Sequence, residues 1–219
     1  MEIMRAKLMS LSVYKKMLET EPVKALLRLT QAKTADGLIE AYTDLVHSVW
    51  KEGFSDLPAC IAWHLKYDES FAGEAIAAGT APEAMLDAAA MDIRRLSSIA
   101  MLSGAGLKRN IAGACSRLGD EYVSIVQNLA ELPMGQAFDE DEIFESYRKN
   151  GCGRFALGRA FHWEKGQLSQ VTHSDPIDQK NMIGYEFQRN AVIENTRVML
   201  SGKPTNNVLL YGDSGTGKS

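Results

Sequence analysis

One-sided apolar stripes are the feature that most limits how this chain can fold. Leu38, Tyr42, Leu45 and Val49 follow one another at spacings of three or four residues. A longer stripe of the same kind comprises Leu86, Ala89, Ile93, Leu96 and Ala100. This is the repeat of an α-helix that buries one face. We therefore predict that residues 1 to about 135 form a compact helical domain, in which the stripes of neighbouring helices share one core.

Glycines predict where these helices end. The breaks lie at Gly53, Gly79, 104–106 and Gly119. They divide the region into six or seven helices. A helix start is predicted at 80–83, because Thr80 can cap the helix and Pro82 is tolerated in its first turn. Glu83 is then expected to reach back to the Thr80 amide.

After residue 135 the pattern changes. The acidic cluster at 139–142 is typical of a helix N-terminus, where carboxylates suit the helix dipole. An acidic patch for docking a partner is the alternative. Apolar residues that alternate around 155–163 are followed by a turn-like stretch at 164–166, a pattern that predicts a small β-hairpin. We expect residues 136–175 to be a linker made of a helix and this hairpin.

The remaining stretch, 176–219, reads as the start of an α/β domain. A helix is predicted from about Tyr185 to Leu200, with a glycine stop at Gly202. The uninterrupted apolar run at 208–211 is typical of a central parallel strand that is buried on both faces. The fold class expected for the whole chain is therefore mainly α, with a helical N-terminal domain, a β-hairpin linker and the start of a P-loop domain.

Residues 212–219, with the sequence GDSGTGKS, match the phosphate-binding pattern G-x-x-x-x-G-K-[ST] at every fixed position. In such a loop the glycines let backbone N–H groups form a cradle for phosphate oxygens. Lys218 is expected to reach the phosphates, and the Ser219 hydroxyl to bind Mg²⁺. A glycine-rich surface turn is the alternative interpretation. The predicted nucleotide-binding residues of the loop are Gly212, Asp213, Ser214, Gly215, Thr216, Gly217, Lys218 and Ser219.

Composition narrows the classes of partner. The net charge is −4 and the pI is about 5.6, so charge gives no general case for nucleic acid or an anionic membrane. The sequence has no apolar stretch long enough for a bilayer and no signal-peptide pattern. Three scattered cysteines argue against a disulfide framework or a zinc site, and the four histidines lack metal-ligand spacing with one another. We expect a cytoplasmic protein.

The stretch MIGYEFQRNAVIENTRVMLSGKPTNNVLLYGDSGTGKS resembles the opening of an AAA+ ATPase module. More narrowly, it resembles a bacterial family of ATP-binding proteins known only as a domain of unknown function. The resemblance implies that Ile183 forms an apolar wall for adenine, that Gly184 lets the backbone approach the base, and that Tyr185 belongs to the same nucleotide-binding set. The alternative is a tight turn before a helix, with Ile183 in an ordinary core.

The resemblance also implies a function. It predicts a protein that binds ATP and Mg²⁺, with Lys218 as the catalytic residue, and couples hydrolysis to remodelling of a protein or nucleic-acid partner. The helical region is expected to recruit an unknown protein partner or to hold the subunits of a homo-oligomer together. Because no acidic strand end, sensor or arginine finger can be assigned, we expect a fragment of a longer ATPase that is itself inactive. Two alternatives stay open: a non-enzymatic helical interaction module, and another P-loop NTPase or kinase.

Overall fold

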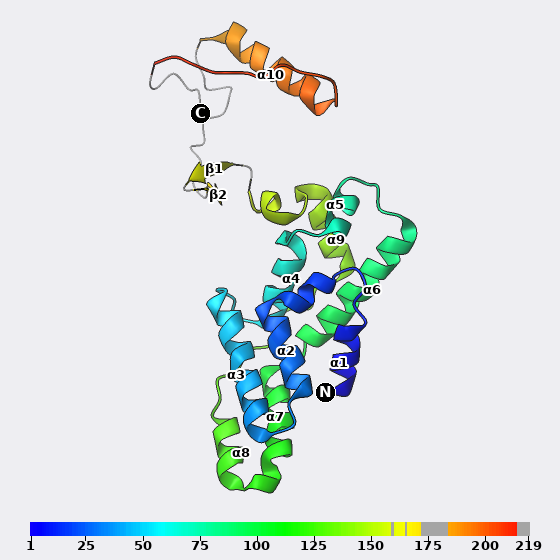
Figure 1. The fold of residues 1–219 in the computed structure, drawn as a ribbon, viewed down its shortest axis with the longest axis vertical. Helices are drawn as coiled ribbons and strands as arrows, with labels where there is room; N and C mark the ends of the chain where they lie inside the picture. The colour runs from blue at the N-terminus through cyan, green and yellow to red at the C-terminus, as the bar shows by residue number, and fades with distance from the viewer. Residues whose placement is uncertain (159, 165, 172–183, 214–219) are drawn as a thin grey trace. The chain divides into compact units, whose positions relative to one another are not determined.

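The computed structural model describes residues 1–158, 160–164, 166–171 and 184–213, and it is mainly helical with a small two-stranded antiparallel hairpin, as predicted (Figure 1). The chain divides into two compact units, Met1–Val171 and Thr172–Ser219. The expected division into 1–135, 136–175 and 176–219 stays a prediction.

The first unit contains nine α-helices among its described residues. They are α1 (Glu2–Met9), α2 (Glu21–Gln31), α3 (Ala35–Lys51), α4 (Leu57–Tyr67), α5 (Phe71–Ala77), α6 (Glu83–Ala100), α7 (Gly104–Cys115), α8 (Asp120–Gln127) and α9 (Glu140–Asn150). Three 3₁₀ helices join them: η1 (Lys15–Glu19), η2 (Ser116–Leu118) and η3 (Gly153–Leu157). Eight α-helices thus precede residue 135, more than the six or seven expected. The excess arises because short helices such as α5, with 7 residues, cannot display a full apolar stripe.

Polar side chains begin several of these helices. Asp56 accepts a hydrogen bond from the Ala59 amide at 2.9 Å and so caps α4. Helices α3, α5, α7 and α9 are capped in the same way, by Thr34, Ser70, Ser103 and Asp139. Each such cap satisfies an amide that the helix leaves unpaired, and typically contributes about 1 kcal/mol. The interpretation of 139–142 as a helix N-terminus is confirmed by the cap of α9.

The predicted helix start within 80–83 is confirmed, but the predicted cap by Thr80 is wrong. Helix α6 begins at Glu83 and is preceded by Pro82, with no side-chain cap. The Thr80 amide donates instead to the Ala75 carbonyl at 2.9 Å, so it closes the preceding helix α5. Gly79, with φ of +68°, makes this turn possible. Since the Thr80 amide is already bonded, Glu83 has no free donor to reach back to.

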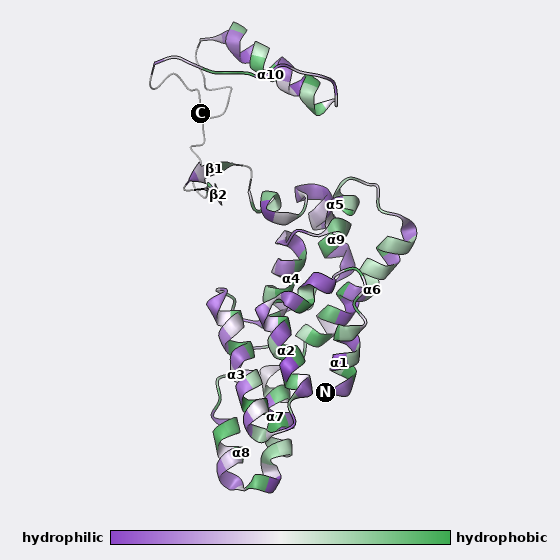
Figure 2. Cartoon of the chain, in the orientation of Figure 1, coloured by the Kyte–Doolittle hydropathy of each residue, from purple (hydrophilic) through white to green (hydrophobic). Residues whose placement is uncertain are grey.

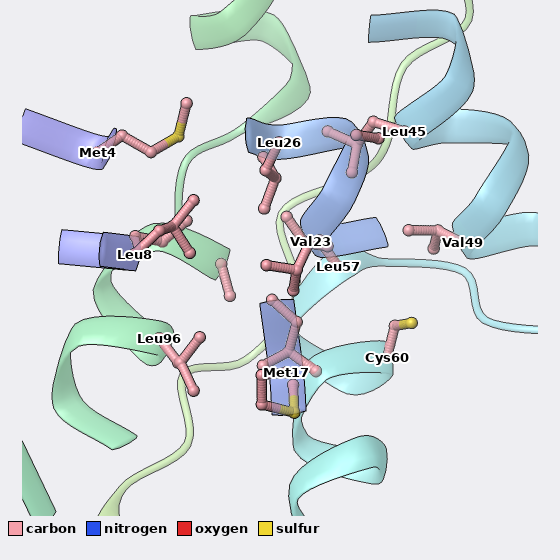
Figure 3. Packing of buried hydrophobic residues seen from close by; sticks show 14 of the residues in the cluster. Met4, Leu8, Met17, Val23, Leu26, Leu45, Val49, Leu57, Cys60 and Leu96 are labelled. Atoms are coloured by element: carbon pink, nitrogen blue, oxygen red, sulfur yellow. The ribbon is translucent and has the colours of Figure 1, made fainter. Parts of the chain in front are cut away.

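The two predicted stripes are confirmed as core-facing. Tyr42, Leu45 and Val49 of α3 are fully buried, as are Ile93 and Leu96 of α6. Figure 3 shows how side chains from α1, η1, α2, α3, α4 and α6 meet in this core. Figure 2 shows the same helices carrying hydrophobic and hydrophilic residues together, as amphipathic helices do.

The core continues past residue 135. Phe138 and, from α9, Ile143, Phe144 and Tyr147 belong to the same buried cluster as the earlier helices. Helix α9 packs against α4, α5 and α6. The Tyr147 hydroxyl donates to the Leu65 carbonyl of α4, and Arg94 of α6 binds Glu140 at the start of α9. Helix α9 is therefore part of the helical core.

One buried carboxylate organises the bend after α1. Asp92 of α6 is fully buried. Its Oδ2 accepts backbone N–H bonds from Ser12 and Val13, both at 2.8 Å, and from Tyr14 at 3.3 Å. Its Oδ1 binds the Arg95 guanidinium at 2.9 Å. Burial of this charge is tolerated because every contact is a donor or a cation.

The β-hairpin closes the first unit. Strands β1 (Phe161–Glu164) and β2 (Gln167–Gln170) pair antiparallel, with Phe161 opposite Gln170 and Trp163 opposite Leu168. Gly166 supplies a turn residue with φ of +80°. The alternating apolar residues predicted a strand from about residue 155, but the first strand begins at Phe161, because Phe155 and Leu157 lie in η3.

The described part of the second unit contains α10 (Glu186–Leu200), close to the predicted bounds. The expected glycine stop follows the helix at Gly202, whose φ is +76°. None of its residues is buried. The predicted strand at 208–211 does not form: these residues have no ladder partner among the described residues, and Leu209 and Tyr211 are 84% and 91% exposed. An apolar run becomes a strand only where a neighbouring strand pairs with it.

Across the described residues, no helix combines the length and the apolar character that crossing a bilayer requires.

Candidate functional site

The turn before α10 has positive φ angles at two consecutive residues. Gly184 has φ of +83°, and an added Cβ there would meet nothing within 4 Å. Tyr185, the residue before the helix, has φ of +59° and is half exposed. A positive φ is uncommon for a residue with a side chain and costs on the order of 1 kcal/mol. The turn expected at this point is present, and Ile183 beside it lies outside the described residues.

After α10 the chain folds back along the helix. The Asn195 side-chain amide donates to the Asn206 carbonyl at 3.0 Å. Residues of the helix and of the returning segment line one hollow, among them Ala191, Asn195, Val198, Pro204 and Asn206. The segment that returns along α10 therefore continues through the apolar run at 208–211 and into the glycine-rich loop.

The structure describes only the beginning of that loop. Gly212 has φ of +151°, a backbone angle that residues with side chains rarely adopt. Asp213 follows it as the last described residue. The other predicted loop residues, Ser214, Gly215, Thr216, Gly217, Lys218 and Ser219, lie outside the described residues. Both described flanks of the predicted nucleotide site thus contain positive φ angles, at Gly184 and Tyr185 on one side and at Gly212 on the other.

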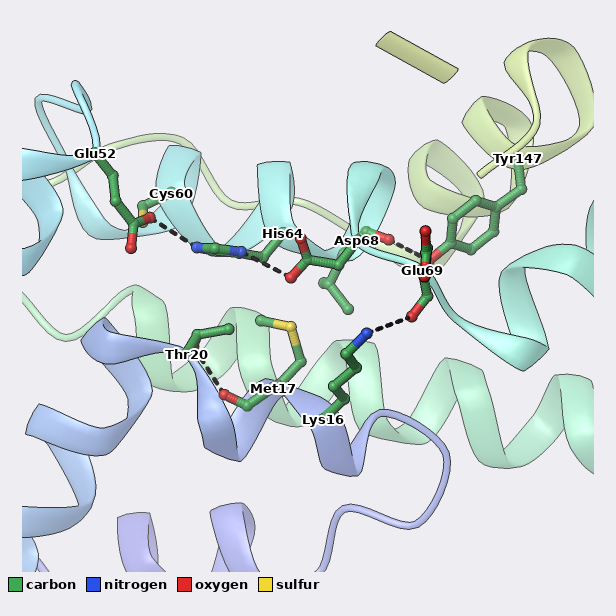
Figure 4. A network of polar contacts seen from close by, with 10 residues as sticks. Lys16, Met17, Thr20, Glu52, Cys60, His64, Asp68, Glu69 and Tyr147 are labelled. Atoms are coloured by element: carbon green, nitrogen blue, oxygen red, sulfur yellow. Dashed lines mark hydrogen bonds and ion pairs between the residues drawn. The ribbon is translucent and has the colours of Figure 1, made fainter. Parts of the chain in front are cut away.

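A second cluster of polar side chains lies in the helical unit, where the sequence predicted none. His64 of α4 makes two short contacts to carboxylates: Nδ1 lies 2.8 Å from Oδ2 of Asp68, and Nε2 lies 2.7 Å from Oε2 of Glu52 (Figure 4). The Cys60 thiol donates to the same oxygen of Glu52 at 3.3 Å. One ligand atom each from Glu52, Cys60 and His64 lies within 4.8 Å of the others.

The protonation of this cluster follows from its surroundings. Burial lowers the pKa of His64, but the hydrogen bonds to Asp68 and Glu52 outweigh burial, so its pKa lies above the ordinary value. Burial raises the pKa of the Cys60 thiol well above its usual range, and the charge of Glu52 adds to the shift. The charges of Asp56 and Asp68 act on this thiol in the same direction. The surroundings therefore favour the protonated forms of both the His64 imidazole and the Cys60 thiol.

The sequence contained a signal for this cluster, in the spacing between a cysteine and a histidine. The spacings among the three cysteines, and those among the four histidines, are not those of metal ligands. Cys60 and His64, however, stand four residues apart on one helix, which places both on the same face. Glu52 is supplied by the end of α3, and only the packing of α3 and α4 at this corner reveals it.

Comparison with known proteins gives one finding. Residues 156–219 match the profile of a family described as "Protein of unknown function (DUF815)". The match covers less than a third of the chain and includes the β-hairpin, α10 and the GDSGTGKS stretch. No curated protein and no solved structure matches the chain. Over this stretch the chain is therefore similar to a family whose description assigns no function, and the AAA+ resemblance stays a prediction.

Proposed function

We propose that this chain binds ATP with Mg²⁺ through residues 212–219 and belongs to an AAA+-type ATPase, which couples hydrolysis to remodelling of a protein or nucleic-acid partner in the cytoplasm. One observation carries the proposal: GDSGTGKS satisfies every fixed position of the phosphate-binding pattern. The helical unit is the part proposed to recruit the partner or to join subunits.

The order of elements before the loop supports this assignment. A helix, a returning segment and an apolar run precede the glycines, and the run at 208–211 is exposed. In an α/β domain such a run is covered on both faces by its neighbours. The Gly212 backbone angle suits the tight turn with which a phosphate-binding loop begins.

Each loop residue has a chemical role in the proposal. Backbone N–H groups of 212–217 surround the phosphate oxygens. Lys218 neutralises charge that develops on the terminal phosphates during transfer, and Ser219 supplies a hydroxyl ligand to Mg²⁺. The positive φ angles at Gly184 and Tyr185 support the proposed approach of this turn to adenine, with Ile183 as an apolar wall.

The test is a matched pair of lysine substitutions in the protein expressed from its own gene. Lys218→Ala is expected to abolish ATP hydrolysis, measured as phosphate release, and to weaken Mg-ATP binding, measured by calorimetry. Lys203→Ala, at an exposed lysine after α10, is the control and is expected to change neither. Hydrolysis at the wild-type rate in Lys218→Ala would show that the loop is not the catalytic site.

The adenine contact has a separate test. Ile183→Ala is expected to weaken the binding of Mg-ATP while leaving the binding of inorganic triphosphate unchanged, because only the former presents a base. Equal loss for both ligands would assign Ile183 to the packing of the loop and not to the base.

A further inference from the structure

Three chemically different metal-ligating side chains meet at the corner between α3 and α4. Glu52 is the C-cap of α3, and Cys60 and His64 lie one turn apart on α4. Figure 4 shows the Glu52 carboxylate pointing at both of the other groups. Cys60 is fully buried, the His64 side chain is 12% exposed, and the Glu52 side chain is 28% exposed. The cluster can therefore be reached from solvent on its carboxylate side.

The imidazole is already oriented. Asp68, the C-cap of α4, contacts Nδ1 at 2.8 Å, which leaves Nε2 facing Glu52. The Trp63 ring lies edge-on to the imidazole, with centroids 5.4 Å apart. A carboxylate behind the histidine is the usual outer partner of a metal-bound imidazole, because it fixes the ring orientation and raises the basicity of the ligand nitrogen.

We propose that Glu52, Cys60 and His64 bind a divalent transition-metal ion of the zinc class, with Asp68 as the outer partner of His64. A thiolate with an imidazole selects zinc-like ions over Mg²⁺ or Ca²⁺, which prefer oxygen. Three protein ligands leave the fourth tetrahedral position for water or for an atom of a partner. The ion ties the end of α3 to α4. This proposal is independent of the nucleotide loop.

The exchange of protons for metal balances in charge. Starting from the form in which His64 carries both ring protons and Cys60 its thiol proton, two carboxylates, one imidazolium and one neutral thiol sum to one negative charge. On binding, the ion takes the places of the Nε2 proton and the thiol proton, and both protons leave to solvent. Two carboxylates, one thiolate, a neutral imidazole and the divalent ion again sum to one negative charge. Loading the site therefore adds no net charge to the half-buried corner.

The two ligand separations that involve Glu52 require only a small adjustment, and the ligand atoms of Cys60 and His64 lie within 4.8 Å of each other. Zinc–ligand bonds of about 2.0 Å to nitrogen and oxygen and about 2.3 Å to sulfur place tetrahedral ligands roughly 3.3–3.6 Å apart. The separations at Glu52 are 2.7 Å to His64 and 3.3 Å to Cys60. Glu52 is the most exposed of the three ligands and follows the end of α3, so its carboxylate can withdraw by the few tenths of an ångström that an ion needs.

Cobalt titration tests the site in the complete 219-residue chain, freed of any affinity tag and treated with a chelator. Co²⁺ is expected to bind one to one, with a thiolate-to-cobalt charge-transfer band in the near ultraviolet, and Zn²⁺ to abolish the band by displacement. Cys60→Ser is expected to lose the band. Cys115→Ser is the matched control, because it alters another fully buried helical cysteine and is expected to keep the band.

Histidine and carboxylate variants complete the test. His64→Gln and Glu52→Gln are each expected to weaken Co²⁺ binding by at least about tenfold. His47→Gln, at an exposed histidine of α3, is expected to leave it unchanged. Glu52→Gln also serves if Cys60→Ser does not fold, because Glu52 lies at the surface. Absence of a charge-transfer band in the wild-type chain, or unchanged affinity in folded Glu52→Gln, would overturn the proposal.

Discussion

Asp92 is a single residue on which the bend after α1 depends. Its carboxylate receives three backbone N–H groups and the Arg95 guanidinium while having no exposed surface. Asp92→Ala removes the acceptor, leaves the three backbone donors unpaired and deprives the Arg95 guanidinium of its carboxylate partner. We expect a loss of about 3–5 kcal/mol in the free energy of unfolding, measured by urea denaturation. Asp87→Ala, at an exposed aspartate of the same helix, is the control, with an expected change within about 0.5 kcal/mol.

At the same scale, Glu140 gives a pH-dependent prediction. Hydrogen bonding to Arg94 lowers the pKa of Glu140 below its ordinary value. A folded-state pKa below the unfolded one stabilises the protein above the unfolded pKa, and this contribution is lost as pH falls through the folded pKa. Glu140→Gln is therefore expected to lower the urea midpoint at pH 7 and to match the wild type at a pH below the folded pKa.

The control for this ion pair is Glu145→Gln. Glu145 is exposed on α9, and no ion pair is recorded for it in the described structure. Its substitution is expected to leave the midpoint unchanged at both pH values. A Glu140→Gln deficit that persists undiminished at low pH would assign the effect to packing and not to the charge.

At the scale of elements, the start of α7 lies against the backbone of the segment that follows α8. A Cβ added at Gly104 would lie 2.7 Å from the Leu132 carbonyl oxygen and 2.9 Å from its nitrogen. Because backbone atoms cannot move aside cheaply, Gly104→Ala is expected to cost about 1–3 kcal/mol. Thermal unfolding followed by circular dichroism measures the change.

Gly113 in the same helix is the matched control. An added Cβ meets nothing within 4 Å there, and the residue is exposed. Gly113→Ala is expected to stabilise the protein by up to about 1 kcal/mol, since alanine loses less backbone entropy in a helix. If both substitutions changed stability in the same direction, the contact at Leu132 would not be the cause.

Structural features that depend only on residues close together in the chain were predictable from the sequence. The stripes of α3 and α6, the cap of α9 and the glycine stop of α10 depend on residues close in the chain. The Thr80 capping box failed because the end of α5 already used its amide. The strand at 208–211 failed because a strand needs a partner, and no local pattern provides one.

At the scale of the whole molecule, the first unit has a packed hydrophobic core, whereas the second has none among its described residues. Every residue of the buried hydrophobic cluster lies between Met4 and Tyr147, and α10 buries none. Residues 1–171 expressed alone are therefore expected to unfold cooperatively, with the melting temperature of the complete chain. Residues 172–219 alone are expected to show no cooperative transition. A drop of several degrees in the 1–171 protein would mean that the core depends on the second unit.

The two candidate sites also differ in what sequence can reveal. The nucleotide loop is contiguous, so its pattern is readable in eight residues, 212–219, whatever the fold. The Glu52, Cys60 and His64 cluster joins the end of one helix to the face of the next. Only the pair on α4 had a sequence signature, and the third ligand depends on how the two helices meet.

Because α5 packs against α9, the buried face of α5 stays uncovered during synthesis until α9 has been made. Ala72 and Ile76 of α5 are buried in the finished unit, where α9 is a main neighbour of this helix. About 60 residues separate the two helices, so a ribosome that adds 5–20 residues per second needs roughly 3–12 seconds to bridge the gap. Throughout that interval α5 has no α9 to cover it. The newborn chain is therefore most open to chaperones, and to other nascent chains, before residue 150 leaves the ribosome.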